Sequence, residues 1–187
     1  MIYYVADTHL GDQRVFDKCA KPFVDLAEYK EEIVKRWNAK VQPEDTVYVL
    51  GDIAGDSSDD IETFRKLNGF KHLIVGNHDI PLLSAIKDSG AFVSIDFIRV
   101  IEDNERKVCI CHYPLMDWME FNRGGYHVYG HMHNKTPNNG VAYAQIKAYY
   151  SDKPAYNAGV DVTGYVPVTL DEMIELKAQN KELPTIN

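Results

Sequence analysis

Five short apolar segments, each followed at once by residues that commonly bind metals or phosphate, constrain this sequence more than any other feature. The segments have strand-like length and composition and cover residues 2–6, 46–50, 72–75, 107–111 and 126–129. The polar residues that follow them are Asp7 and His9, Asp52, Asn77 with His78 and Asp79, His112, and His131 with His133. Because sites in open α/β sheets form outside the carboxyl ends of the strands, we expect these clusters to share one site.

Helical patterns lie between the strands. They cover residues 23–41, 57–69, 81–90 and 169–180. The last of them opens with a capping box formed by Thr169 and Glu172. Residues 92–101 predict a sixth strand. Strands that alternate with helices indicate an α/β protein, and a length of 187 residues suits a single domain over residues 1–187.

Composition narrows the possible functions. The chain is 45% hydrophobic, which is enough for a sizeable core, and it has no run of about 18 apolar residues that could span a membrane. Its first residues form a predicted strand and lack a signal-like segment, so we expect a cytoplasmic protein. The net charge of -8 argues against charge-driven binding to nucleic acid or membranes, although it leaves room for a local basic groove.

Some residues with chemical potential are expected to be structural. Cys109 and Cys111 alternate along a predicted strand, so both should point to one face as buried apolar side chains. His72 and His127 lie at or near strand starts, where surface or hydrogen-bonded strand residues are expected.

The spacing of His131 and His133 leaves three interpretations open. Both imidazoles would point to the same side of an extended segment, where they could hold one ion, two ions or none. Gly51, Gly76 and Gly130 stand immediately before the polar clusters. Glycine at these positions favours a sharp turn and a close approach of the backbone to a packed site.

The clusters follow a recognisable order. They read D-T-H at 7–9, G-D at 51–52, G-N-H-D at 76–79, H at 112 and G-H-M-H at 130–133. This series resembles the signature of the calcineurin-like metallophosphoesterase superfamily, and residues 157–173 resemble the end of its small bacterial capless branch. The resemblance covers nearly the whole chain and implies a four-layer α-β-β-α sandwich, in which two mixed β-sheets pack face to face.

The resemblance also implies a ligand set. One metal ion would be held by Asp7, His9, Asp52 and His133, and a second by Asp52, Asn77, His112 and His131, with Asp52 bridging. Asn77 and His78 would bind the substrate, and His78 would be the catalytic residue.

Seven ligands are too many for one tetrahedral ion and suit two divalent transition-metal ions. Imidazole, carboxylate and one amide oxygen fit Mn foremost, with Fe, Zn or Ni as alternatives. The implied reaction is in-line attack by a metal-bridging hydroxide on a small phosphomonoester or phosphodiester, with His78 protonating the leaving oxygen or stabilising its charge. His131 and His133 then become a fork, one imidazole to each ion, with Met132 pointing into the core.

Three positions need separate interpretation. Many superfamily members carry an acid three or four residues after the G-D aspartate, but this chain has Gly55 there, which leaves the orientation of His78 open. Asp12 stands where the small branch commonly has histidine. It could face the substrate or be a solvated loop acid, and we favour the loop acid. Asp79 could orient its loop or cap the helix that begins near Pro81, and we favour the cap.

Two other functions compete with the phosphoesterase. A nuclease acting on DNA or RNA ends is disfavoured by the acidic charge and by the lack of room for a large cap domain. A catalytically silent binding scaffold would be signalled by loss of His78 or of a ligand, and every motif is intact. Arg123 and Lys135 are interpreted as solvated loop charges rather than phosphate contacts.

Overall fold

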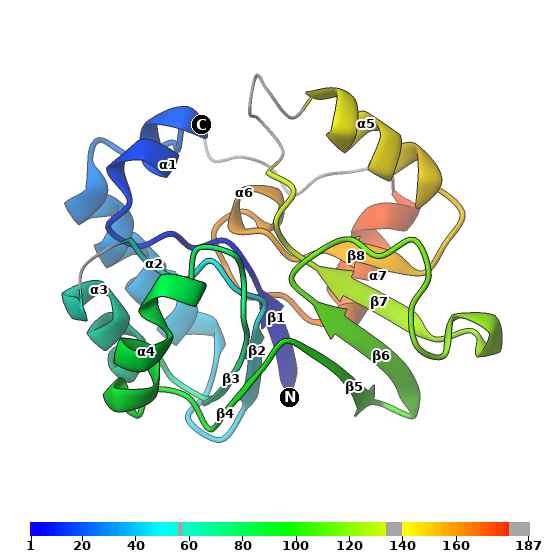
Figure 1. Cartoon of the computed structure of the whole chain (residues 1–187), viewed down its shortest axis with the longest axis horizontal. Helices are drawn as coiled ribbons and strands as arrows, with labels where there is room; N and C mark the ends of the chain where they lie inside the picture. Colours follow the sequence, from blue (N-terminus) through cyan, green and yellow to red (C-terminus); the bar gives the residue numbers. More distant parts are fainter. Residues whose placement is uncertain (56–57, 134–139, 180–187) are drawn as a thin grey trace.

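The computed structural model describes residues 1–55, 58–133 and 140–179. Two four-stranded sheets pack face to face, with helices on the outer faces (Figure 1). The expected four-layer α/β architecture is therefore confirmed.

The first sheet contains the first four strands in sequence order. They are β1 (Ile2–Val5), β2 (Thr46–Val49), β3 (Phe70–Ile74) and β4 (Ser94–Asp96), and all pair in parallel. An isolated antiparallel bridge from Tyr4 to Val168 adds a further partner beside β1. Because the strands are parallel, their carboxyl ends lie at one edge of the sheet.

The second sheet mixes directions. Its strands, in order, are β5 (Ile98–Asp103), β6 (Arg106–Cys111), β7 (Tyr126–Tyr129) and β8 (Ala155–Asn157). β5 and β6 form an antiparallel hairpin, and the remaining pairs are parallel. Asn104 and Glu105 make the turn with φ of 49° and 64°, the left-handed geometry that two-residue hairpins favour.

The helices vary from one turn to four. The α-helices are α1 (Gln13–Lys18), α2 (Leu26–Lys40), α3 (Ser58–Glu62), α4 (Leu83–Ser89), α5 (Gly140–Tyr149), α6 (Val160–Thr163) and α7 (Leu170–Ala178). The 3-10 helices are η1 (Thr63–Lys66), η2 (Ile80–Leu82) and η3 (Phe121–Arg123). In the described part of the chain, none of these combines the length and apolar character that a membrane crossing requires.

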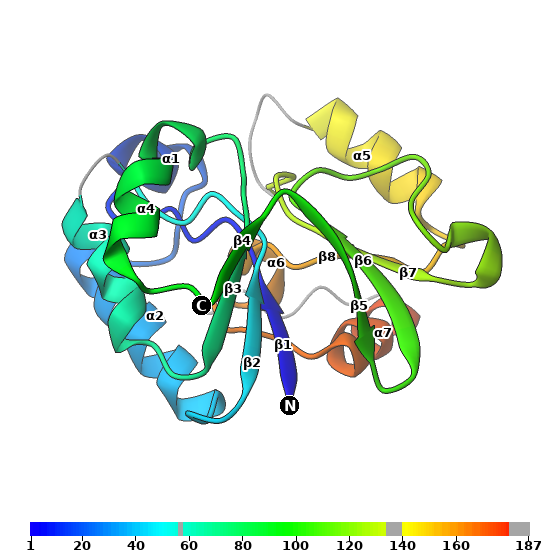
Figure 2. The same cartoon turned by 60° about the horizontal axis from the view of Figure 1, so that its bottom comes forward.

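Three apolar clusters separate the layers. The first joins the outer face of the first sheet to α2, α3 and α4, which lie together on one side in Figure 2. The second fills the space between the sheets, where Val108 and Ile110 of β6 face Tyr4 and Leu50. The third joins the outer face of the second sheet to α5. Strand side chains alternate between clusters, as the pleat requires.

The local sequence patterns predicted most of the helices and strands that the structure contains. The capping box of Thr169 and Glu172 is present at α7, and the helical patterns correspond to α2, to α3 with η1, and to η2 with α4. Residues 92–101 are not one strand, because the chain leaves the first sheet after β4 and enters the second at β5. Phe97 lies between the two and is exposed. The helices α1, α5 and α6 and the strand β8 were not predicted.

Three of the four residues expected to be structural are fully buried or nearly so. Cys109 and Cys111 are buried free thiols. His127 is buried in β7, where its Nδ1 contacts the Cys109 carbonyl at 3.0 Å and its Nε2 accepts from the Leu115 N–H at 3.2 Å. His72 is half-buried and contacts the Ser94 hydroxyl at 2.8 Å. The prediction of hydrogen-bonded strand histidines is confirmed.

His127 should make stability depend on pH. Burial lowers the pKa of His127 to about 4, whereas an unfolded histidine has a pKa of about 6.5. Its contribution is therefore complete above pH 6.5 and is lost as pH falls toward 4, by about 3 kcal/mol in the free energy of unfolding. Denaturant unfolding between pH 7 and 4 measures this loss, and His127→Gln should flatten the slope. Equal slopes for both proteins would contradict the assignment.

Candidate metal centre

The loops that follow five strands meet at one end of the sandwich. The Asp7 N–H donates to the Gly51 carbonyl at 3.0 Å, which joins the loops after β1 and β2. The Gly130 N–H donates to the His112 carbonyl at 2.9 Å, which joins the loops after β6 and β7. Main-chain hydrogen bonds thus bring segments that are far apart in the sequence into contact.

Six of the predicted donors form two groups. In each group, one ligand atom per residue lies within 4.8 Å of the others. The groups are Asp7, His9 and His133, and Asp52, His112 and His131. Asp52 Oδ2 lies 3.4 Å from His112 Nε2 and 3.6 Å from His9 Nε2, so this oxygen faces both groups. Asn77 Oδ1, the seventh predicted donor, lies 3.2 Å from His112 Nε2.

The two histidines of the G-H-M-H segment fall in different groups. His131 belongs with Asp52, and His133 belongs with Asp7. Met132 between them is buried and packs in the apolar cluster under α5. This separation agrees with the fork interpretation, which remains a prediction about ions.

The backbone is strained at four of these residues. Their φ angles are 58° at Asp7, 44° at His9, 54° at Asp52 and 67° at His131. Residues with a Cβ rarely adopt this left-handed region, and such strain is concentrated at functional sites. The Asp7 carboxylate accepts from the His131 N–H at 2.9 Å, which helps to hold two of the strained residues together.

Glycines leave the space that the Asp7 and Asp52 carboxylates occupy. A Cβ on Gly130 would lie 2.6 Å from Asp7 Oδ2, and a Cβ on Gly76 would lie 2.3 Å from Asp52 Oδ1. Gly51 has φ of +81°, a conformation that glycine adopts without steric cost. The close approach expected from the sequence is confirmed at these positions.

The buried carboxylates attract positive charge. Burial raises the pKa of Asp7 to about 7. Burial also raises the pKa of Asp52, but the hydrogen bond with His112, the charges of His112 and His9 and the hydrogen bond from the His78 N–H together outweigh it and hold the pKa at about 2. Burial lowers the pKa of His112, but the same hydrogen bond, the charges of Asp7 and Asp52 and the contact with the Leu50 carbonyl together raise it to about 9. In the protein without metal, the positive charge of the His112 imidazolium therefore compensates the negative charge of Asp52. A metal cation at the same place would compensate that charge equally.

A divalent cation fits this donor set. Both ring nitrogens of His9 are buried, and within the described ranges neither has a hydrogen-bond partner. A buried polar atom without a partner is costly, and a cation beside Asp7 and Asp52 would give one nitrogen a partner. Imidazole, carboxylate and amide oxygen together suit first-row transition metals.

Asp79 does not cap the following helix, and that expectation was wrong. Its side chain makes no cap hydrogen bond at η2 and is fully buried. Asp79 Oδ2 accepts from the Asp52 and Gly76 N–H groups at 2.9 and 2.8 Å, and Oδ1 accepts from the Ile53 N–H at 2.9 Å. One carboxylate thus joins the loops after β2 and β3, because three backbone donors there point at the same buried position.

Asp12 is not a solvated loop acid, and that expectation was also wrong. It is buried and caps α1, where its Oδ1 accepts from the Val15 N–H at 3.0 Å. Its carboxylate belongs to a third group of close donors, together with His9 and His78. The His78 ring is exposed and meets the His9 ring edge-on at 4.9 Å between centroids.

Two supporting contacts were missed by sequence reasoning. Asp161 is buried beside His133, with 3.3 Å between Oδ2 and Nδ1. Tyr29 of α2 donates its hydroxyl proton to the carbonyl of Thr8, between the donors Asp7 and His9. Asp161 is the first of three acids in the tail segment 157–173, but nothing local indicates that it reaches a histidine 28 residues away.

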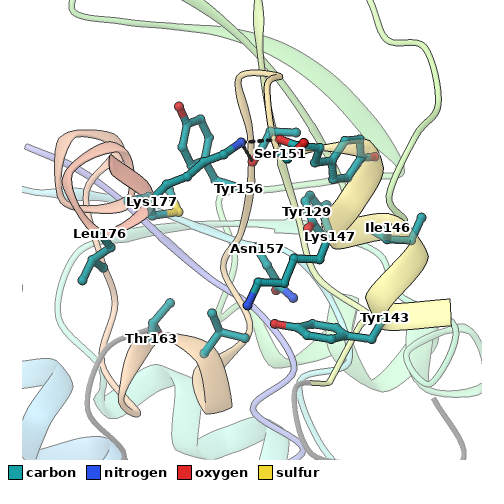
Figure 3. Close-up of a pocket in the computed structure, with 14 residues that line it drawn as sticks. Tyr129, Tyr143, Ile146, Lys147, Ser151, Tyr156, Asn157, Thr163, Leu176 and Lys177 are labelled. Carbon is teal, nitrogen blue, oxygen red and sulfur yellow. Dashed lines mark hydrogen bonds between the residues drawn. The ribbon is translucent and has the colours of Figure 1, made fainter. Parts of the chain in front are cut away.

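Two cavities differ in chemistry. One of about 410 Å³ is lined by donors from both groups and by His78. The other, of about 270 Å³, lies between α5 and α7, where Tyr143 and Lys147 project from α5 toward Asn157 (Figure 3). Among the described residues, no Asp, Glu, His or Cys lines it. The larger cavity therefore contains the predicted chemistry.

Of the two cations interpreted as solvated loop charges, the structure describes only one. Arg123 is 80% exposed and pairs with Glu120 at 3.3 Å, which agrees with a solvated loop charge. Lys135 lies outside the described residues. Tyr143, Tyr150 and Tyr156 all line the smaller cavity, and Tyr150 is also buried in the outer cluster.

Comparisons with known proteins cover the whole chain. The profile of the calcineurin-like phosphoesterase family matches residues 1–110. The uncharacterized protein MJ1445 of Methanocaldococcus jannaschii is 31% identical over 189 residues, which cover 100% of this chain and 96% of that protein. The gene 66 protein of Mycobacterium phage L5 is 32% identical over 83 residues, 42% of this chain and 40% of that protein.

One solved structure shares the fold over nearly its full length. It is the protein of unknown function AQ665 from Aquifex aeolicus, with a TM-score of 0.70 and 24% sequence identity. The match covers 94% of this chain and 98% of that chain.

Asp79 should contribute to stability more than an ordinary helix cap. Asp79→Ala leaves three buried backbone N–H groups without a partner, and we expect a loss of about 3 kcal/mol or more in the free energy of unfolding. Asp25→Ala is the control, because it removes an exposed cap of α2 worth about 1 kcal/mol. Urea unfolding measures both, and equal losses would refute the proposed joining of the loops.

Proposed function

Because the chain belongs to the calcineurin-like phosphoesterase family, we propose that it is a binuclear metal-dependent hydrolase of small phosphate esters. One observation carries the binuclear assignment. Asp52 Oδ2 lies within 3.6 Å of an imidazole from each donor group, which is the arrangement that a bridging carboxylate needs.

The proposed ligands follow the two groups. One ion is assigned to Asp7, His9, Asp52 and His133, and the other to Asp52, Asn77, His112 and His131. The first set carries two carboxylates, and the second replaces one of them by the neutral amide of Asn77. Mn²⁺ is the foremost candidate, and Fe, Zn and Ni are the alternatives. When bound, two such ions lower the pKa of water and neutralise charge on the phosphoryl oxygens.

The chain itself provides the proton for the leaving group. His78 is exposed on the wall of the larger cavity, and its backbone N–H donates to Asp52 Oδ1 at 2.8 Å. The catalytic loop is therefore attached to the proposed bridging carboxylate. As the P–O bond breaks, the His78 imidazolium donates a proton to the leaving oxygen, which avoids expulsion of an alkoxide.

The supporting contacts keep the donors in place. Asp161 holds one edge of the His133 ring, so that the other edge faces Asp7 at 4.0 Å between Nε2 and Oδ1. A carboxylate behind a ligand histidine fixes its tautomer and its ring orientation. Asp79 and Tyr29 fix the backbone of the loops through hydrogen bonds to the Asp52 N–H and the Thr8 carbonyl.

Metal removal and replacement test the proposal. The protein is stripped with a chelator, reloaded separately with Mn²⁺, Fe²⁺, Zn²⁺ or Ni²⁺, and assayed with p-nitrophenyl phosphate and bis(p-nitrophenyl) phosphate. We expect no turnover in the stripped protein and recovery with at least one ion. Absence of hydrolysis of both esters with every ion would overturn the proposed function.

His78 should act on turnover and not on metal content. His78→Ala removes the proton donor but no proposed ligand, so we expect a fall in kcat of about 10²–10⁴-fold with metal content per chain unchanged. His72→Ala, an imidazole change on β3 outside both donor groups, is the matched control and should retain activity. Metal loss in His78→Ala, measured by elemental analysis, would show that the assigned role is wrong.

A further inference from the structure

Part of the wall of the larger cavity is formed by α1 (Gln13–Lys18). Arg14 and Lys18 both line this cavity, together with the donors and His78. They are four residues apart, so they lie on the same face of the helix. Neither residue belongs to a sequence motif, and α1 itself was not predicted.

Neither helix stability nor the overall composition explains why Arg14 and Lys18 line the cavity. Like charges four residues apart destabilise a helix, and α1 has only six residues. The protein as a whole carries a net charge of -8, so a basic pair beside the donors is not a consequence of composition. Arg14 is 81% exposed and approaches Asp12 Oδ1 only to 3.8 Å, whereas Lys35 and Arg36 on α2 reach Glu32 at 2.7 and 2.9 Å.

The cavity also has more room than one phosphoryl group needs. Its volume of about 410 Å³ falls within the range of small-molecule sites, about 300–1,000 Å³. A water molecule takes about 30 Å³ in the liquid, so a phosphoryl group of five heavy atoms fills a minor part of the space. The α1 cations line the same cavity.

We propose that Arg14 and Lys18 bind a second phosphoryl group of the substrate, so that the natural substrate is a small ester with two phosphoryl groups. This inference rests on the proposed function, which places the scissile group at the metal donors and His78. A guanidinium binds a phosphate through two parallel hydrogen bonds, and the lysine ammonium adds a point charge. The substrate class is thus a bisphosphate or a comparable doubly phosphorylated compound.

Binding of non-hydrolysable probes tests the subsite without turnover. Calorimetry on the Mn²⁺-loaded full chain compares propane-1,3-diyl bisphosphonate with propylphosphonate, and adds 4-phosphonobutanoate as a carboxylate analogue. We expect the bisphosphonate to bind about tenfold more tightly than either monophosphonate, a difference of about 1.4 kcal/mol. Equal affinity for the bisphosphonate and the carboxylate analogue, or for all three probes, would overturn the phosphoryl assignment.

Variants of α1 identify the residues responsible. Arg14→Gln combined with Lys18→Gln should abolish the preference for the bisphosphonate, and Lys18→Arg alone should retain it. The control is Arg65→Gln combined with Lys66→Gln, which removes the same charge from η1, outside the cavity lining, and should keep the preference. A preference that survives in the α1 double variant would refute the proposal. Failure to hydrolyse any ester, with the binding preference intact, would instead overturn the proposed function alone.

Discussion

Two buried carboxylates, Asp7 and Asp52, impose the constraint on which the rest of the structure depends. A buried charge costs several kcal/mol unless it is paired and hydrogen-bonded. Each carboxylate accepts one backbone N–H from another loop, from His131 in the case of Asp7 and from His78 in the case of Asp52. The remaining acceptor positions of the two carboxylates face imidazoles. The negative charge of the site is therefore compensated only when protons or metal ions lie among these side chains.

The geometry of the loops follows from this requirement. Within each group the donors lie within 4.8 Å of one another, the backbone is left-handed at Asp7 and Asp52, and no space remains for a Cβ at Gly76 or Gly130. Strain of this kind persists only when surrounding contacts over-determine it. Asp79 provides such contacts through three backbone N–H groups. The donors therefore occupy loops, but loops that are anchored to one another.

The contacts that anchor the loops also hold the metal donors and the proton source in position for the proposed reaction. A donor or a proton source that is displaced by about 1 Å can lose most of its effect on a reaction. Asp161 behind His133 and Tyr29 behind Thr8 lie outside the proposed ligand set, yet each restricts a ligand or its loop. Arg14 and Lys18 line the same cavity from α1 and take no part in these two contacts.

The sequence predicted the strand ends and the donor groups because each signal is local. An apolar run followed by a polar cluster marks a strand and its carboxyl end without knowledge of the rest of the chain. The roles of Asp12 and Asp79 could not be predicted in this way. Asp79 contacts backbone 26 and 27 residues away, and Asp12 caps a helix too short to give a periodic pattern.

The strands show the same limit. Residues 92–101 form one apolar run, but the chain passes from one sheet to the other inside it, and only the packing of the sheets determines where. β8 has three residues, Ala155–Asn157, and pairs with β7 from 28 positions further along the chain. Its strand character arises from that pairing and not from its own sequence, which is common for edge strands of this length.

The central claim is that Asp52 joins two metal ions, and electron paramagnetic resonance of the Mn²⁺-loaded protein tests it most directly. The account predicts two Mn²⁺ per chain with an exchange-coupled spectrum, and loss of the coupling in Asp52→Asn. One Mn²⁺ per chain with an uncoupled spectrum in the wild-type protein would contradict it.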